Sequence, residues 1–177
     1  MKIEHGLIHI YTGDGKGKTT AALGAALRAL GWGLRVVMIQ FIKGYPNLGE
    51  IKFAQEYPDR FTIHQFALDT ERDIDEKKVL ARKQEADKAM NFAEQIVNSA
   101  EYDVVILDEL AVALHYNLIE LDRVLQLIRE KPKSVELIIT GRNAPQALID
   151  AADYVTEMLP VRHPYEKDIQ ARPGVDY

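Results

Sequence analysis

Apolar residues gather along the chain in short, β-branched runs that are bounded by turn-forming residues. The runs lie at 7–11, 34–40, 61–65, 104–107, 135–140 and 154–158. Their lengths are those of buried strands, which are shorter than most helices. The pattern therefore predicts one strand for each run.

The segments between these runs carry apolar residues at helical spacing. Alanine and leucine dominate 19–30, and Gly31 follows as a helix end, so a helix is predicted there. Two shorter helices are predicted over 121–128 and 145–151. A long helix is predicted after the charged stretch at 69–78, because apolar residues repeat there at intervals of three and four: Ala86, Ala89, Met90, Ala93, Ile96, Val97 and Ala100.

Strands that alternate with helices require crossover connections, which make neighbouring strands parallel. The sequence thus predicts an α/β fold with a mostly parallel central sheet and helices on both faces. A chain of 177 residues is long enough for one filled core and short for two, so a single domain over 1–177 is expected. Ligands of such sheets bind at the carboxyl ends of the strands.

The turn after the first predicted strand reads YTGDGKGKTT, residues 11–20. Its glycines let backbone N–H groups turn towards an anion, and the next helix directs its N-terminus at the same spot. Lys18 is spaced to reach phosphate oxygens, and Thr19 to bind phosphate-bound magnesium. The residues predicted to bind a nucleotide here are Gly13, Asp14, Gly15, Lys16, Gly17, Lys18, Thr19 and Thr20.

This loop differs from an ordinary phosphate loop in three residues. Thr12 stands where such loops open with glycine, and Asp14 and Lys16 lie inside the loop. We expect Asp14 to face away from the phosphates and to bond a loop amide. A glycine-rich turn with solvated lysines is the alternative, which the flanking strand and helix disfavour.

Two later turns carry side chains suited to the same ligand. The run DVVILDEL ends in Asp108 and Glu109, whose oxygens suit magnesium and would lie beside the loop if the two strands are neighbours. Arg142 follows the strand at 135–140, and its guanidinium would recognise phosphate at the same edge. Purely structural acids and an exposed loop arginine are the alternatives. Arg28 lies on the first predicted helix, where a surface salt bridge is its default role.

Composition narrows the function further. A net charge of -5 argues against a nucleic acid as the main partner, and the lack of cysteine excludes disulfides and thiolate chemistry. The only serines, Ser99 and Ser134, are not in a hydrolase motif, and the histidines lack zinc spacing. No signal peptide or membrane-spanning run is evident, so a cytoplasmic protein without a membrane partner is expected.

Taken in chain order, several segments resemble the P-loop family of ATP:cob(I)alamin adenosyltransferases, the corrinoid adenosyltransferases. They are GLIHIYTGDGKGKTTAALGAALRALGWGLRVVMIQFIKG, the GE pair at 49–50, DVVILDEL, ITGRNAP, ADYVTEM and RHPYEKDIQARPGVDY. These segments cover most of the chain. QFIKG, TGR-x-AP and the HPY tail are more specific than any phosphate loop.

This resemblance implies a RecA-like P-loop NTPase fold and a defined reaction. The family moves the 5′-deoxyadenosyl group of ATP onto the Co(I) of a reduced corrinoid and releases triphosphate, in adenosylcobalamin synthesis or salvage. The implied ligands are ATP, Mg²⁺ and cob(I)alamin or a precursor corrinoid. A reductase that delivers Co(I) and a homodimer are implied as partners.

The resemblance also assigns roles to residues. No side-chain nucleophile is expected; Lys16 and Lys18 would stabilise the triphosphate, with magnesium held through Thr19, Asp108 and Glu109. Arg28 and Arg142 match family arginines near the nucleotide. Phe41, Lys43, Phe66 and His163 are the residues expected on the corrinoid side.

Two departures from the family pattern bear on the corrinoid side. The aromatic segment that helps to strip the lower axial ligand from cobalt is replaced by FALDTE at 66–71, and the sole tryptophan is Trp32. Phe66 or another aromatic residue would have to substitute. The chain begins shortly before its first strand, so the N-terminal cover of some relatives is expected to be absent.

Two other functions remain open at this point. A small P-loop ATPase or phosphotransferase would use Lys18, Thr19, Asp108 and Glu109 without a corrinoid. A nucleotide-binding regulatory module that has lost catalysis would explain the altered segment at 66–71. The first would release or transfer the γ-phosphate of ATP, and the second would bind its ligands without turnover, so products distinguish both from the transferase.

Overall fold

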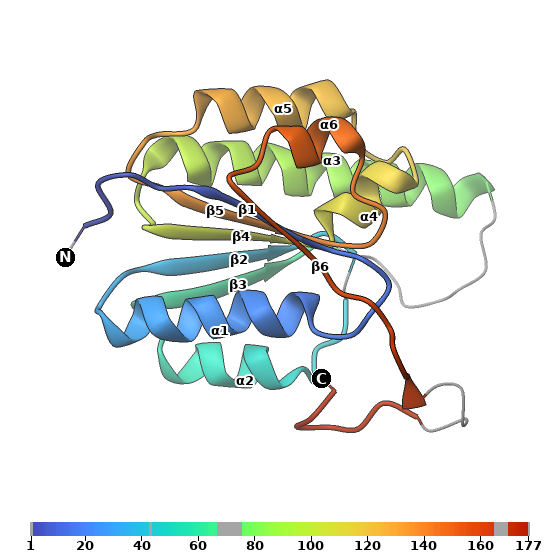
Figure 1. Cartoon of the computed structure of the whole chain (residues 1–177), viewed down its shortest axis with the longest axis horizontal. Coiled ribbons are helices and arrows are strands. Elements are labelled where there is room, and N and C mark those ends of the chain that lie inside the picture. The colour runs from blue at the N-terminus through green and yellow to red at the C-terminus, as the bar shows by residue number, and fades with distance from the viewer. Residues whose placement is uncertain (1, 43, 67–75, 165–169, 177) are drawn as a thin grey trace.

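A six-stranded parallel sheet forms the centre of the computed structural model (Figure 1). The structure describes all residues except 1, 43, 67–75, 165–169 and 177. The strands are β1 (Ile8–Thr12), β2 (Val36–Gln40), β3 (Phe61–Gln65), β4 (Val104–Asp108), β5 (Glu136–Thr140) and β6 (Tyr154–Glu157). Their order across the sheet is β3-β2-β4-β5-β1-β6.

Helices cover both faces of this sheet, as Figure 1 shows. One face carries α1 (Lys18–Gly31) and α2 (Gly49–Glu56). The other carries α3 (Glu76–Ser99), α4 (Leu110–His115), α5 (Leu121–Glu130) and α6 (Gln146–Asp150). The predicted α/β fold with helices on both faces is confirmed. Among the described residues, no helix is both long and apolar enough to cross a bilayer.

The predicted strands all form, with ends that differ from the prediction by at most two residues. The helices α2 and α4 were not predicted, for two physical reasons. In α2 only Ala54 is buried, so the helix has little of an apolar stripe. The six residues of α4 follow directly after a strand, and the apolar run LAVALH has no period that distinguishes it from more strand.

Each face of the sheet has its own hydrophobic core. Alternate strand residues point to opposite faces, so Val37 and Ile39 pack under α3 to α6, whereas Val36 and Met38 pack against α1 and α2. The strands β2 and β4 are buried along their whole length. The carboxyl ends of these strands are therefore held in place from both sides.

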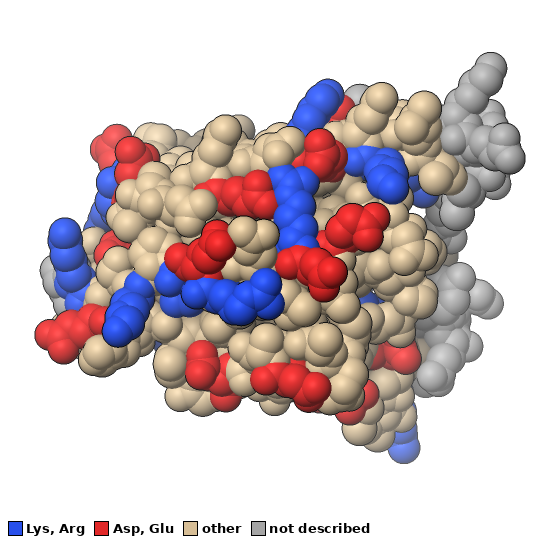
Figure 2. Space-filling model, turned by 90° about the horizontal axis from the view of Figure 1, so that it is seen from above, with Lys and Arg blue, Asp and Glu red and all other residues tan. Residues whose placement is uncertain are grey.

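The outer surface over α3 and α5 has a mixed charge. In Figure 2, acidic and basic side chains alternate on the face seen from above, without a continuous basic area. Between these helices, the Arg123 guanidinium of α5 donates to Asp87, Asn91 and Glu94 of α3. These contacts join two helices and explain the raised pKa of Arg123, to which the Glu94 hydrogen bond contributes most.

The strand order bears on the condition under which the acid pair was expected beside the loop, namely that the two strands are neighbours. The sheet places β5 between β1 and β4, so the strand that leads into the glycine-rich loop is not a neighbour of the strand that ends in Asp108. The two still end at one edge of the sheet. In the described part of the chain, every buried polar or charged residue lies at or beside this edge: Thr12, Lys18, Gln40, Asp108 and Thr140.

Candidate active site

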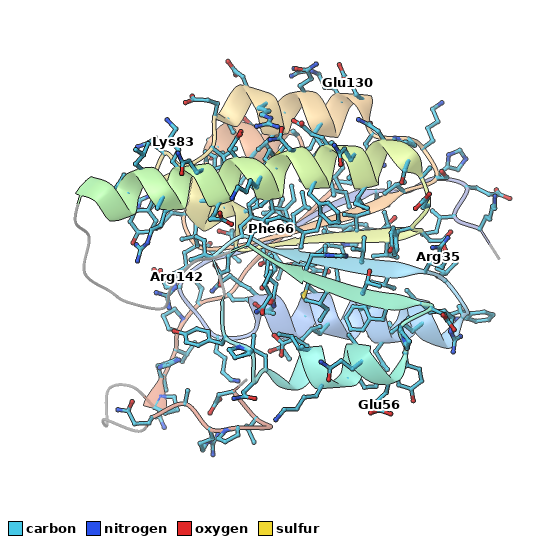
Figure 3. All side chains as sticks on the ribbon, turned by 180° about the vertical axis from the view of Figure 1, so that it is seen from behind. Arg35, Glu56, Phe66, Lys83, Glu130 and Arg142 are labelled. Carbon is cyan, nitrogen blue, oxygen red and sulfur yellow. The ribbon has the colours of Figure 1, made fainter. Side chains whose placement is uncertain are left out.

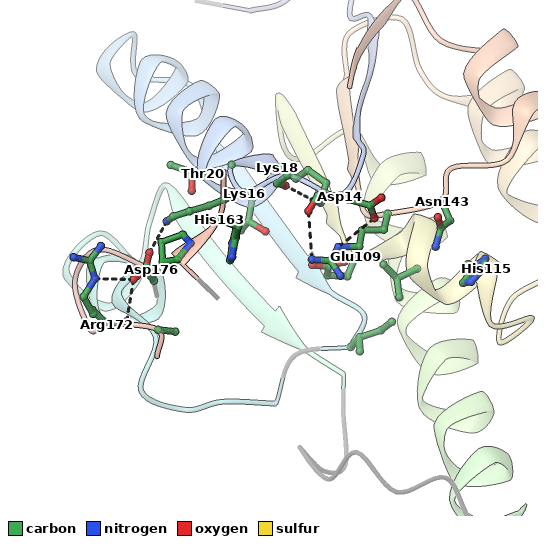
Figure 4. A pocket seen from close by; sticks show the side chains of 18 of the residues that line it. Asp14, Lys16, Lys18, Thr20, Glu109, His115, Asn143, His163, Arg172 and Asp176 are labelled. Atoms are coloured by element: carbon green, nitrogen blue, oxygen red, sulfur yellow. Dashed lines mark hydrogen bonds and ion pairs between the residues drawn. The ribbon is translucent and has the colours of Figure 1, made fainter. Parts of the chain in front are cut away.

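A pocket of about 680 Å³ opens at the carboxyl edge of the sheet. Its walls come from the loop before α1, from the start of α4, from the turn after β5 and from the C-terminal tail, as Figure 4 shows. The predicted residues at 14–20 line it, together with Glu109, Arg142 and His163. Burial of polar groups at this edge and the presence of a pocket there make it the candidate site.

Close backbone contact shapes the loop. A Cβ atom on Gly13 would lie 2.5 Å from the carbonyl oxygen of Met158, and one on Gly15 would lie 2.7 Å from the same atom. Gly13 also has a φ of 91°, which disfavours other residues. The Gly15 N–H donates to the Met158 carbonyl at 2.7 Å. The glycines are therefore needed for contact with the segment after β6.

Thr12, the residue that replaces the usual opening glycine, has a structural position. It is the last residue of β1 and pairs with Glu157 of β6. Its hydroxyl accepts a hydrogen bond from the Ala144 N–H at 3.3 Å. Thr12 thus ties the start of the loop to the turn after β5.

Lys18 is folded over its own loop. Its Nζ donates to the carbonyl oxygens of Gly13 and Gly15, both at 2.7 Å, and the residue is 8% exposed. Gly17, at the N-cap of α1, has a φ of 123° and allows the sharp turn into the helix. The ammonium group and the positive end of α1 are therefore held beside the pocket lining.

Thr19 and Asp108 meet across the intervening strand. The Thr19 hydroxyl donates to Asp108 Oδ1 at 2.9 Å, and the Thr140 hydroxyl of β5 donates to the same oxygen at 2.7 Å. Thr140 also accepts from the Glu109 N–H at 3.0 Å. Asp108 has no exposed surface. Thr140 therefore holds the acid pair at the end of β5, and Thr19 joins Asp108 to the loop, although β1 and β4 are not neighbours in the sheet.

Glu109 owes its position to an unusual backbone conformation. Its φ of 62° is in the left-handed region, which non-glycine residues seldom adopt. This turn ends β4, begins α4 and leaves Glu109 lining the pocket. Such strain is often found at functional sites.

The side chains at this point fit a hard divalent cation. Thr19, Asp108 and Glu109 offer oxygen atoms only, as magnesium prefers. Among the described residues, no group of three or more histidine, cysteine, aspartate or glutamate side chains is arranged to hold a metal ion by itself. That donor set suits an ion that completes its coordination with water and phosphate oxygens.

Gln40, which sequence reasoning did not single out, supports Asp108 from the other side. It has no exposed surface, and its Nε2 donates to Asp108 Oδ2 at 3.5 Å and to Glu50 Oε1 at 3.3 Å. Gln65 Nε2 in turn donates to Gln40 Oε1 at 2.9 Å. This chain of amides orients the acid from β2 and β3.

Two basic side chains of the pocket are close to acids. Lys16 Nζ lies 2.9 Å from Asp176 Oδ1 and donates to the Val175 carbonyl at 3.1 Å. Arg142 Nη2 donates to the Asp14 carbonyl at 3.4 Å, and its Nε lies 3.9 Å from Asp14 Oδ1. The expectation that Asp14 bonds a loop amide is therefore wrong, since its carboxylate lies beside Arg142.

The tail acid Asp176 has a strongly perturbed pKa. The hydrogen bond from Lys16 lowers the pKa of this carboxyl group most, followed by hydrogen bonds from the backbone and side chain of Arg172. Arg172 N and Nε both lie 3.0 Å from Asp176 Oδ2. Asp176 therefore stays ionised at neutral pH.

Some predicted residues are not at the pocket. Arg28 is exposed in the last turn of α1 and is not among the pocket residues. Phe41 is 3% exposed and belongs to the core, so it would have to leave the core to reach a ligand. Phe66 packs on Phe92 with ring centroids 5.6 Å apart. Lys43 lies outside the described residues.

Figure 3 places Phe66 and Arg142 towards the carboxyl edge of the sheet and Arg35 at the opposite edge. Although Phe66 is partly exposed at this edge, it does not line the pocket. Of the four residues predicted for the corrinoid side, His163 is the one that lines the pocket in the part of the chain that the structure describes.

Sequence reasoning also missed several lining residues. Val112, His115 and Tyr116 come from α4 and its end, and Arg172 and Asp176 come from the tail. The residues of α4 could have been predicted to line the pocket, because they follow directly after the acid pair in the sequence. The tail residues had no local signal, because their proximity to the loop depends on the path of the chain after β6.

Known proteins give the context for this geometry. The sequence model of the family described as ATP:corrinoid adenosyltransferase BtuR/CobO/CobP matches residues 4–177. Corrinoid adenosyltransferase from Pseudomonas aeruginosa is 37% identical over 178 residues, which is 98% of this chain and 85% of that protein. Corrinoid adenosyltransferase from Escherichia coli strain K12 is 35% identical, over 98% of this chain and 87% of that protein.

A similarity in structure agrees with the fold. Flagellar accessory protein FlaH from Methanocaldococcus jannaschii superposes with a TM-score of 0.59 at 13% identity, over 88% of this chain and 72% of that one. This likeness concerns the fold alone, an α/β fold with a six-stranded parallel sheet. The sequence match, in contrast, spans nearly the whole chain. This protein therefore belongs to the ATP:corrinoid adenosyltransferase family.

Proposed function

We propose that this protein transfers the 5′-deoxyadenosyl group of ATP to the Co(I) of a reduced corrinoid and releases triphosphate. The observation that carries the proposal is the family match over residues 4–177. The Thr19 to Asp108 contact and the pocket beside it support a nucleotide site in the matched region.

The reaction is a substitution at carbon. The electron pair of cobalt(I) forms the bond to C5′ of the ribose, and the bond between C5′ and the triphosphate oxygen breaks. That oxygen keeps the bonding pair, and the metal is formally oxidised to Co(III). Because the corrinoid is itself the nucleophile, the protein needs to supply orientation and charge stabilisation only.

The loop supplies positive groups for the leaving triphosphate. Lys18 Nζ, now on the carbonyls of Gly13 and Gly15, would turn to phosphate oxygens, and Lys16 would contribute a second ammonium group. The backbone amides of residues 13–19 and the start of α1 add partial positive charge. Arg142, at the mouth of the pocket, is suited to contact the same group.

Magnesium is proposed to accompany the nucleotide. Thr19 and Glu109 would hold it, and Asp108 would act behind them through its bond to the Thr19 hydroxyl. When bound, the ion would supply positive charge to the leaving oxygens. The role of Arg28 at the nucleotide stays a prediction, because ten residues along α1 from Lys18 correspond to about 15 Å.

The corrinoid side rests on fewer contacts. His163 and Tyr116 line the pocket and could meet a flat macrocycle there. Phe66 would need to separate from Phe92 to do so. We also propose a cytoplasmic location, a homodimer, and a reductase that delivers Co(I), all of which rest on family resemblance.

The decisive experiment supplies ATP, magnesium and chemically reduced cobalamin to the purified protein. We expect a photolabile product with a cobalt–carbon bond and one triphosphate for each corrinoid alkylated. ADP and orthophosphate without an alkylated corrinoid would instead establish a P-loop ATPase or phosphotransferase. Binding of both substrates without turnover would indicate a regulatory module.

A further inference from the structure

The C-terminal tail lines the pocket and contacts a lysine of the loop. Lys16 Nζ lies 2.9 Å from Asp176 Oδ1 and 3.1 Å from the carbonyl oxygen of Val175. Figure 4 shows Asp176 between Lys16 and Arg172. The contact joins two walls of one pocket that are 160 residues apart in sequence.

Asp176 is held in place by a second basic group. The Arg172 backbone N–H and Nε both donate to Asp176 Oδ2 at 3.0 Å, while the other oxygen faces Lys16. The Asp176 N–H donates back to the Arg172 carbonyl at 2.8 Å. A short turn therefore presents one carboxylate oxygen to the loop lysine.

That oxygen contacts Lys16 in the way that an oxygen of an anionic ligand would. A carboxylate oxygen at 2.9 Å from an ammonium nitrogen has the geometry of a charge-assisted hydrogen bond, as a phosphate oxygen would. The Lys16 side chain is 45% exposed, in contrast to the buried Lys18. Lys16 therefore has room to exchange one anionic partner for another.

We propose that Asp176 competes with triphosphate for Lys16. The carboxylate holds Lys16 when the pocket contains no triphosphate, gives it up when the more highly charged ligand binds, and takes it back as triphosphate leaves. Asp176 thereby weakens the hold of the site on its product. The inference rests on the proposed function for the assignment of the pocket to triphosphate.

The size of the effect follows from the exposure of the pair. A partly exposed ion pair changes an equilibrium by about twofold to fivefold, and the loss of a negative charge beside the bound phosphates adds to this. Replacement of Asp176 by asparagine keeps the shape of the side chain and removes its charge. We expect Asp176→Asn to bind triphosphate about threefold to tenfold more tightly.

The test is calorimetric titration of the full chain with inorganic tripolyphosphate and magnesium, without a corrinoid. Asp59→Asn is the control, since it removes the same charge from an exposed residue just before β3, at the opposite edge of the sheet. It should leave the affinity unchanged. The effect of Asp176→Asn should be smaller in a Lys16→Ala background, where only the repulsion between the carboxylate and the phosphates is left to remove, and thermal melting should report unchanged folding.

Several results would overturn the inference. Equal or weaker binding by Asp176→Asn would mean that the tail orders the pocket for its ligand. An equal gain in the Lys16→Ala background would mean that Asp176 does not act through Lys16. Failure of the unmodified protein to bind tripolyphosphate would reject both this inference and the proposed site, whereas binding without an Asp176 effect would reject the inference alone.

Discussion

The loop before α1 and the C-terminal tail line the same pocket but are held by different forces. The loop is fixed by backbone contact with Met158 and by the buried Lys18. The tail is held by ion pairs of Asp176 with Lys16 and Arg172, all of which retain solvent contact. Steric contact and buried hydrogen bonds resist salt, whereas partly exposed ion pairs are screened. We therefore expect the loop to act as a fixed wall of the pocket and the tail as a removable one.

The largest effect is expected from the buried lysine of the fixed wall. Lys18→Ala removes the ammonium group that lies 2.7 Å from two loop carbonyls and would face the triphosphate. Triphosphate affinity and adenosyl transfer should fall about 100-fold or more. Titration and a turnover assay measure this loss. Lys88→Ala, on the exposed surface of α3, is the control, and near-normal binding by Lys18→Ala would refute the role of this residue.

The next effect tests the steric contact of the loop. Gly15→Ala places a Cβ atom 2.7 Å from the Met158 carbonyl oxygen, so either the loop or the segment after β6 must move. A strain of about 1–3 kcal/mol should lower ATP affinity by about 10-fold or more. Gly24→Ala on α1 is the matched control, because a Cβ atom there meets nothing within 4 Å. Equal ATP affinity in both variants would contradict a loop fixed by packing.

A smaller effect is expected at the strand between the loop and the acids. Thr140→Val removes the hydroxyl that donates to Asp108 at 2.7 Å and accepts from the Glu109 N–H at 3.0 Å. The two polar groups left behind should destabilise the fold by about 1–3 kcal/mol and raise the magnesium concentration needed for turnover. Thermal melting and a magnesium titration measure these changes. Thr140→Ser should restore both, and failure of this rescue would point to packing instead of the hydroxyl.

The smallest effect concerns how the hydrogen-exchange protection of the two walls responds to salt and pH. Raising the ionic strength from about 0.05 M to 0.5 M should lower the hydrogen-exchange protection of the Asp176 amide by no more than about fivefold and leave the Gly15 amide unchanged. The pKa of Asp176 is lowered from 3.8, so its contribution is complete above that value and is lost only in stronger acid. Protection should thus be constant between about pH 5 and 8. Equal salt sensitivity at both amides would remove the distinction between the walls.

Much of the fold could be predicted because its signals are local. The β-branched runs and the alanine-rich segment after Lys18 identify strands and a helix by period alone. The loop was recognisable because glycine, lysine and threonine at this spacing, between a strand and a helix, are typical of phosphate binding. In contrast, α2 escaped prediction because it buries a single residue, Ala54.

The candidate site was predictable only in part. Lys18, Thr19, Glu109 and Arg142 line the pocket as their positions at strand ends suggest. Phe41 was expected at the corrinoid, but its side chain packs in the core. The motif QFIKG does not by itself show which of its side chains points into the core. Asp108 was expected beside the loop if its strand and β1 were neighbours. The two strands are separated by β5, and the Thr19 hydroxyl reaches Asp108 directly, while Thr140 of β5 donates to the same carboxylate oxygen.

The sequence by itself determined the strands, the helices other than α2 and α4, the chemistry of the loop and the family, because each is encoded in residues close together or in an ordered set of motifs. Only the tertiary structure decided which distant groups meet. The bond from Thr19 to Asp108 depends on strand order, and the pair of Lys16 with Asp176 depends on the path of the tail. Hydrogen bonds and ion pairs act over a few ångströms, so contacts between distant segments exist only once the sheet has brought those segments together.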